Sequence, residues 1–140
     1  MAIINQKLTS INADTDLTTP LHDKIMLWLD NYVETHTFKQ QFPDIFLEGY
    51  QILKTWECPI AKNNYLIGFA DLRILINGVA FYFEVKSTIP SLGEVLRQVR
   101  KYQYATQDVR WFVVSPDTRF KNEIIKQKVG FITAFQDKEQ

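Results

Sequence analysis

Residues 65–86 read YLIGFADLRILINGVAFYFEVK, and most of the fold can be worked out from them. The dipeptide Asn77-Gly78 favours a two-residue type I′ turn, because both turn positions need a positive φ. β-Branched and aromatic residues are frequent on both sides of the turn, which predicts two antiparallel strands over residues 65–76 and 79–86. If Ile76 pairs with Val79, paired residue numbers sum to 155. Asp71 is then predicted to lie opposite Glu84.

This register separates polar from apolar side chains. Side chains alternate along a strand, so Asp71, Glu84 and Lys86 are expected on one face. The other face is predicted to be core and carries Leu72, Ile74, Phe81, Phe83 and Val85. As a non-hydrogen-bonded pair, the two carboxylates would have Cβ atoms about 4.5–5.5 Å apart. Two like charges this close cost stability, and a divalent cation, with help from Lys86, would neutralise them.

Upstream of this hairpin the sequence predicts a helix, a connector and another strand. Thr19-Pro20 is typical of a helix start. Apolar residues follow at helical spacing, which predicts a helix to about residue 36 whose core face carries Leu21, Ile25, Leu29, Tyr32 and Val33. Residues 37–44 are predicted to be a connector with at most one helical turn. A strand is predicted over residues 50–60, with turn residues at Asn63-Asn64.

Downstream, helices and strands alternate. Ser91-x-x-Glu94 is a capping box, which predicts a helix to about Tyr104. We then expect a strand at residues 110–115, a helix at 121–128 and a strand at 130–135. The element order is α-β-β-β-α-β-α-β. Because strands joined through helices run parallel, an α/β fold with a mixed β-sheet flanked by helices is predicted.

Length and composition exclude several classes of protein. The chain has 140 residues, 46% of them hydrophobic, which predicts a single domain over residues 19–140 after a loose polar leader at 1–18. No apolar run could span a bilayer and no signal peptide is recognisable, so a cytoplasmic protein without a membrane segment is expected. Cys58 is the only cysteine, and with only His22 and His36 beside it there is no zinc-site spacing.

The formal net charge is zero, so binding to nucleic acid would need a local basic patch. Basic residues are frequent in the C-terminal half, at Arg97, Arg100, Lys101, Arg110, Arg119 and Lys121. On charge alone, an ordinary solvated surface explains them equally well.

Three motifs together resemble the PD-(D/E)xK nuclease superfamily over roughly residues 50–135. They are Gly68-Phe69-Ala70-Asp71-Leu72-Arg73-Ile74 on a strand, Phe83-Glu84-Val85-Lys86 on the next, and Gln98-x-x-x-Tyr102 on the helix that follows. The last is similar to the Q-x-x-x-Y element of the RecB-type branch. Ala70 stands where the family name has proline, at a position that varies. The resemblance implies a restriction-endonuclease-like core and a metal-dependent nuclease that hydrolyses phosphodiester bonds in DNA.

The resemblance also implies roles for particular residues. The metal would be held by Asp71, Glu84 and Val85, while Lys86 would orient the attacking water or hold a phosphate oxygen. Gln98 and Tyr102 would lie beside the metal site and hold the helix and the DNA. The residues expected to contact DNA are Arg97, Lys101 and Arg73.

The family often adds an upstream acidic residue, and Glu34, Glu48 and Glu57 all compete for that place. Glu57 is favoured, because its strand should neighbour that of Asp71, although it could equally be a solvent-facing strand residue. Oxygen ligands without histidine or cysteine favour Mg²⁺ or Mn²⁺ over zinc.

Other interpretations remain open at this point. Asp71, Glu84 and Lys86 could be an exposed cross-strand charge cluster. The chain could be a catalytically inactive nuclease-fold module that binds nucleic acid or a partner protein, or an enzyme acting on a small phosphoester. A minimal nuclease domain is typical of phages, mobile elements and defence or repair systems. An endonuclease of this size is expected to act as a homodimer or within a larger DNA-processing complex.

Overall fold

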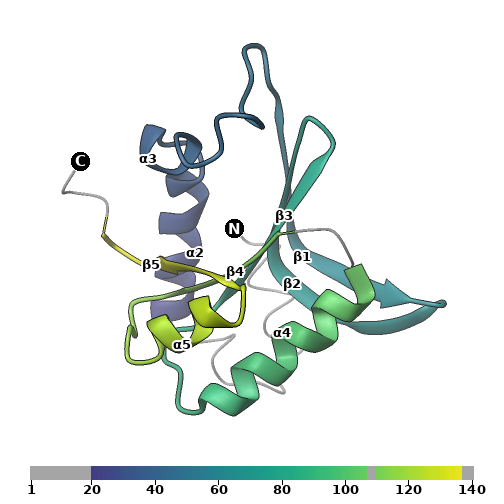
Figure 1. Cartoon of the computed structure of the whole chain (residues 1–140), viewed down its shortest axis with the longest axis vertical. Helices are drawn as coiled ribbons and strands as arrows, with labels where there is room; N and C mark the ends of the chain where they lie inside the picture. Colours follow the sequence, from purple (N-terminus) through teal and green to yellow (C-terminus); the bar gives the residue numbers. More distant parts are fainter. Residues whose placement is uncertain (1–19, 107–109, 137–140) are drawn as a thin grey trace.

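The computed structural model describes residues 20–106 and 110–136, so the predicted leader at 1–18 and the cap at Thr19 lie outside the described residues (Figure 1). Its elements are α2 (Pro20–Tyr32), α3 (His36–Lys39), β1 (Ile52–Lys62), β2 (Tyr65–Ile76), β3 (Val79–Val85), α4 (Leu92–Thr106), β4 (Arg110–Ser115), α5 (Lys121–Lys126) and β5 (Gly130–Thr133). The strands form one sheet in the order β1-β2-β3-β4-β5. The first three are antiparallel and the last three parallel. The predicted α/β fold with a mixed sheet flanked by helices is confirmed.

The first helix is shorter than predicted. It ends at Tyr32, and Thr35 takes an extended conformation with φ −80° and ψ 157°. The Thr35 Oγ1 accepts a hydrogen bond of 3.3 Å from the Phe38 N–H, which makes Thr35 the N-cap of the separate helix α3. Leu21, predicted for the core, is exposed, whereas the other predicted core residues of the helix are buried.

Both hairpin turns follow from their residues. Asn77 and Gly78 have φ values of 50° and 81°, as the type I′ prediction requires. Asn63 and Asn64 also have positive φ values, 53° and 68°, and join β1 to β2 in the same manner. Residues that tolerate positive φ therefore set both antiparallel connections.

The strand register is confirmed between β2 and β3. Pairs run from Ile76 with Val79 to Leu72 with Phe83. The β1 strand starts and ends two residues later than predicted, and its pairing with β2 shifts by one residue between Ile60 and Ala61.

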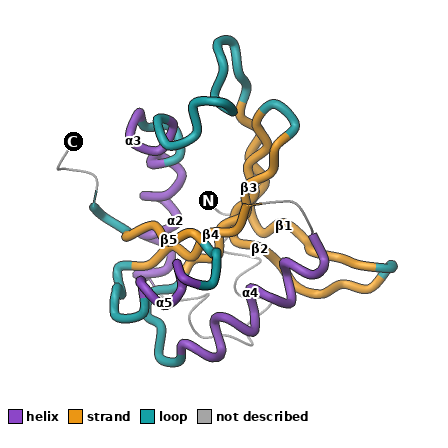
Figure 2. The backbone as a smooth tube through the Cα atoms, viewed as in Figure 1, coloured by secondary structure: helices purple, strands orange, loops and turns teal. Residues whose placement is uncertain are grey.

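The sheet separates two hydrophobic cores. Figure 2 shows the helices that cover them, which lie on different sides of the strands. One core lies under α2 and α3 and contains all five residues predicted from the alternation, Leu72, Ile74, Phe81, Phe83 and Val85. The other lies under α4, where Val95 and Val99 pack with residues of β1 and β4. Among the described residues, no helix has the length and apolar character needed to cross a membrane.

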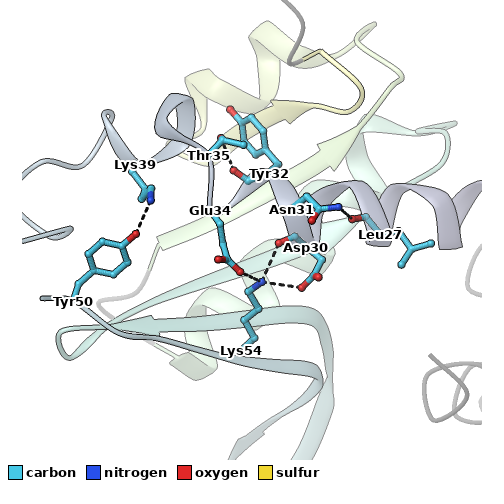
Figure 3. A network of polar contacts seen from close by, with 9 residues as sticks. All are labelled: Leu27, Asp30, Asn31, Tyr32, Glu34, Thr35, Lys39, Tyr50 and Lys54. Atoms are coloured by element: carbon cyan, nitrogen blue, oxygen red, sulfur yellow. Dashed lines mark hydrogen bonds and ion pairs between the residues drawn. The ribbon is translucent and has the colours of Figure 1, made fainter. Parts of the chain in front are cut away.

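Polar contacts fasten α2 and α3 to β1 and the loop before it (Figure 3). The Lys54 Nζ donates to Asp30 O and Oδ1, both at 2.9 Å, and to Glu34 Oε2 at 2.5 Å. Burial opposes the charge of Lys54, but these hydrogen bonds outweigh it and raise the pKa of the amine. The Lys39 Nζ donates to the Tyr50 hydroxyl at 2.6 Å. These bonds add to the packing of the buried α2 face on the sheet, and the first turn of α2 reaches the candidate site.

Candidate active site

Asp71 and Glu84 lie where β2 and β3 part. Only 5% of Asp71 and 4% of Glu84 is exposed, so the interpretation of these carboxylates as an exposed surface cluster is wrong. Regular pairing ends at Leu72 with Phe83, and the two carboxylates occupy the next position on each strand. Buried carboxylates are uncommon unless a charge or hydrogen-bond donor accompanies them.

A backbone N–H orients the Asp71 carboxylate. If the ladder continued, the Val85 N–H would bond to the carbonyl of Ala70. It donates instead to Asp71 Oδ2 at 2.7 Å. The Asp71 carboxylate thus replaces the Ala70 carbonyl as the acceptor of this N–H. The backbone of Val85, predicted as a metal ligand, therefore lies beside Asp71.

Glu57 joins the two carboxylates from the neighbouring strand. The pairs Trp56 with Leu72 and Cys58 with Ala70 flank Glu57 on β1 and Asp71 on β2, so these two acids occupy matching positions. Only 4% of Glu57 is exposed. Three adjacent strands therefore bring Glu57, Asp71 and Glu84 to one level of the sheet.

The backbone at Glu57 is unusual, with φ at 48°. A glutamate in this region is strained by about 1–3 kcal/mol, and such strain is often found at functional sites. It also lets β1 change the face that it presents, because Trp56 packs against the α2 core and Cys58 belongs to the α4 core. The competing acids lie elsewhere: Glu34 binds Lys54, and Glu48 is exposed before β1.

His22 is a site residue that the sequence analysis missed. It lies in the first turn of α2, is fully buried, and places its Nε2 3.7 Å from Asp71 Oδ1. An imidazole therefore lies beside the Asp71 carboxylate, whereas the sequence analysis expected oxygen donors alone; which of these groups binds a metal stays a prediction. A sequence signal did exist, because His22 shares the buried helix face with Ile25, Met26 and Leu29.

Lys86 extends the charged group beyond β3. Its Nζ is 3.7 Å from Glu84 Oε2, and 17% of its side chain is exposed. Its backbone N–H donates to Val114 O at 2.9 Å, which continues the parallel pairing with β4. The ammonium group is thus held beside Glu84 yet remains accessible from solvent.

Tyr102 and Gln98 of α4 cover the other side of the site. Burial raises the pKa of the Tyr102 hydroxyl, and the charges of Glu84 and then Asp71 raise it further, while hydrogen bonds with Gln98 and the Phe69 backbone act in the opposite direction. The Tyr102 hydroxyl lies against Gly68 of β2, three residues before Asp71. Gln98 and Tyr102 thus interact with each other and with β2, and their place beside a metal site stays a prediction.

Tyr102 also depends on a glycine. A Cβ atom built on Gly68 would lie 2.4 Å from the Tyr102 hydroxyl oxygen, closer than any side chain allows. Gly68 therefore leaves the space that the tyrosine occupies against β2.

Asp117, which no sequence motif indicated, holds the loop between β3 and α4. Its Oδ2 accepts hydrogen bonds from the Ile89 N–H at 2.8 Å, the Thr88 hydroxyl at 3.1 Å and Arg119 Nη2 at 2.8 Å. Arg119 also donates to the Ile89 carbonyl at 2.9 Å. Donation from Arg119, then from the Ile89 backbone, holds the pKa of the Asp117 carboxyl well below its usual range. The segment that follows Lys86 is thereby fixed to the loop after β4.

The basic residues predicted to bind DNA lie in two places. Arg97 and Lys101 are exposed on α4. Arg73 is half-buried on β2 and lies over the Tyr82 ring, 6.0 Å from its centre.

The donors at this site suit a cation that keeps several waters among its ligands. Among residues 20–106 and 110–136, no three His, Cys, Asp or Glu side chains gather closely enough to enclose a metal ion by themselves. Mg²⁺ commonly uses only one or two protein carboxylates and keeps several waters, so the paired carboxylates suit such an ion. Comparisons of the chain with protein-family models, curated proteins and solved structures found no match.

Proposed function

We propose that this protein is a metal-dependent nuclease with a restriction-endonuclease-like core, which hydrolyses phosphodiester bonds in DNA. The observation that carries the proposal is the row of buried carboxylates Glu57, Asp71 and Glu84 on adjacent strands, with His22 3.7 Å from Asp71 and Lys86 3.7 Å from Glu84. Several buried acids at one level of a sheet have little value for stability, because like charges repel. Their arrangement is understandable if a cation joins them.

Asp71 and Glu84 would hold Mg²⁺ or Mn²⁺, with the Val85 backbone as a further candidate ligand. His22 and Glu57 do not close around the same point as the two carboxylates, so they would bind the ion only if their side chains moved towards it. An imidazole ligand favours Mn²⁺, because Mg²⁺ prefers oxygen donors alone. When bound, the ion supplies Lewis-acid stabilisation of charge on the phosphate and lowers the pKa of a bound water.

The chain's own groups prepare the site for the phosphate. The Val85 N–H holds one oxygen of Asp71, which leaves the other oriented towards His22. Lys86, partly exposed, orients the attacking water or binds a phosphate oxygen. Gln98 and Tyr102 hold α4 against β2, so that the basic residues of α4 are positioned for DNA.

The proposal is tested by incubating supercoiled, linear duplex and single-stranded DNA with the protein and Mg²⁺ or Mn²⁺. We expect Asp71→Asn to abolish cleavage and Lys86→Met to lower the rate about 10²- to 10³-fold, the usual cost of removing a group that stabilises transition-state charge. Matched controls are Asp44→Asn and Lys126→Met, at exposed positions away from the site.

Cleavage that persists in EDTA or in Asp71→Asn would contradict the proposal. A folded wild type that cleaves none of these substrates would instead favour an inactive module that binds nucleic acid or a partner protein. Calorimetric titration with Mn²⁺ separates the two, since a decayed site has no reason to bind the ion. Light scattering with and without DNA tests the expected homodimer.

A further inference from the structure

Exposed aromatic residues surround Lys62 at the tip of the β1–β2 hairpin. Lys62 is the cross-strand partner of Tyr65, and its Nζ lies 4.5 Å from the centre of the Tyr104 ring. It also contacts the Tyr104 carbonyl at 3.5 Å. Tyr65 is 75% exposed and Tyr104 69% exposed. Neither ring therefore serves the core, and both residues lie beside Lys62, Tyr65 as its cross-strand partner and Tyr104 through its ring.

The surroundings of this group are basic. Figure 1 shows the C-terminal end of α4 beside the hairpin, whose tip projects past it. On α4, Arg97, Arg100 and Lys101 precede Tyr104 at spacings of seven, four and three residues, which places them along one exposed face. The only acidic residue of the helix is Glu94, in its first turn. A positively charged helix face thus ends at two exposed aromatic rings.

A helix face of basic side chains that ends at exposed aromatic rings is complementary to a single-stranded nucleic acid. Its phosphates bind basic side chains, and its unpaired bases stack on aromatic rings. In a duplex the bases are stacked on one another and cannot lie flat on the tyrosines. An acidic protein would satisfy the cations but gives no reason for two exposed tyrosines around a lysine.

We propose that Tyr65, Lys62 and Tyr104 form a stacking platform for unpaired nucleotides, so that the preferred DNA substrate carries a single-stranded segment. The statement about substrate rests on the proposed nuclease function. Along β2, Tyr65 lies roughly 20 Å from Asp71, at about 3.3 Å per residue. The platform therefore contacts nucleotides several positions away from the bond to be cut.

The test is fluorescence anisotropy with a labelled oligothymidylate of about 20 nucleotides and a duplex of equal length, in EDTA. We expect tighter binding to the single strand, and a loss of about fivefold or more for Tyr65→Ala and for Tyr104→Ala. The phenylalanine variants keep the rings and are expected within about twofold of the wild type. Leu53→Ala, at another exposed position on β1, is the matched control and should bind normally.

Salt dependence provides a second measurement. If Lys62 contacts a phosphate, Lys62→Gln should reduce the slope of log K against log salt by about 0.7, the value for one contact to a single strand. Tyr65→Ala should leave this slope unchanged, because it removes stacking and no charge.

Wild-type affinity for the single strand in both alanine variants would overturn the platform, and so would equal binding of the duplex. A loss of self-association in these variants without a loss of DNA binding would also overturn it, by showing a protein interface. Cleavage is measured separately. A metal-dependent nuclease whose tyrosine variants bind normally refutes only the platform, whereas tyrosine-dependent binding without cleavage refutes only the nuclease.

Discussion

The contact between Gly68 and Tyr102 allows a quantitative test of how α4 is anchored. In Gly68→Ala the new Cβ would lie 2.4 Å from the Tyr102 hydroxyl oxygen and 2.9 Å from its Cε1. Tyr102 cannot simply turn outwards, because its ring is buried and stacked on Trp111 with centroids 5.3 Å apart. The substitution must therefore displace either β2 or the tyrosine.

The expected cost has two parts. Forcing an extra methyl group into a packed region costs about 1–3 kcal/mol. Displacing the hydroxyl also weakens its hydrogen bonds with Gln98 and the Phe69 backbone, each worth about 1 kcal/mol when intact, and their partial loss adds about 1 kcal/mol in total. We expect Gly68→Ala to lower the free energy of unfolding by about 2–4 kcal/mol. Urea unfolding followed by tryptophan fluorescence measures this, and Trp111 reports from beside the contact.

Two further variants make the test specific. Gly93→Ala is the matched control, since its Cβ would approach no atom closer than 3.6 Å and alanine favours the helix, so this variant should be at least as stable as the wild type. Tyr102→Phe removes the hydroxyl oxygen that the new Cβ of Gly68→Ala would meet. The double variant should therefore lose less unfolding free energy than the sum of the losses of the two single variants. An unchanged urea midpoint for Gly68→Ala, or strict additivity, would refute the anchoring of α4 through this contact.

Three more predictions concern charge. Because the pKa of Asp117 is held low, its ionised form stabilises the fold above about pH 4, and this contribution is lost as the pH falls below that value. The free energies of unfolding of the wild type and Asp117→Asn, measured in urea from pH 7 to pH 2.5, should therefore converge. A constant difference between them would contradict this role. Mn²⁺ at a hundred times its Kd should stabilise the wild type by about 2.7 kcal/mol in thermal unfolding. Asp71→Asn should lose this stabilisation and His22→Ala should reduce it. Equal stabilisation of all three proteins would exclude both residues as ligands. Lys54→Met should cost about 1 kcal/mol or less at pH 7 in urea unfolding, because its acidic partners are largely exposed, and a loss above about 3 kcal/mol would show that the contact is stronger than its exposure indicates.

Local chemistry explains why much of the sheet could be predicted. Asn77-Gly78 needs positive φ at both positions, and this turn alone set the β2–β3 register and brought Asp71 and Glu84 to neighbouring positions. The helix start at Ser91 also formed as predicted, with the Glu94 N–H donating to Ser91 Oγ at 3.2 Å. In each case residues a few positions apart determine the outcome.

The remaining parts of the site depend on packing between distant segments. His22 reaches Asp71 because the buried face of α2 packs across the sheet, and no spacing in the sequence expresses that contact. The positive φ of Glu57 arises where β1 passes from one core to the other, which propensities do not predict for a glutamate. The role of Asp117 likewise appears only when two loops meet.

Strands β1, β2 and β3 hold Glu57, Asp71 and Glu84 at one level of the sheet. This arrangement limits the number of residues between the carboxylates more strictly than it limits which residues stand there. Inserting a single residue between Asp71 and Glu84 would turn one of them to the opposite face of the sheet, since side chains alternate. The tip of the first hairpin is more tolerant. There the register already shifts between Ile60 and Ala61, so β2 carries one residue more than β1 without disturbing the position of Glu57. In related chains, insertions are therefore expected at that tip and excluded from the Asn77-Gly78 hairpin.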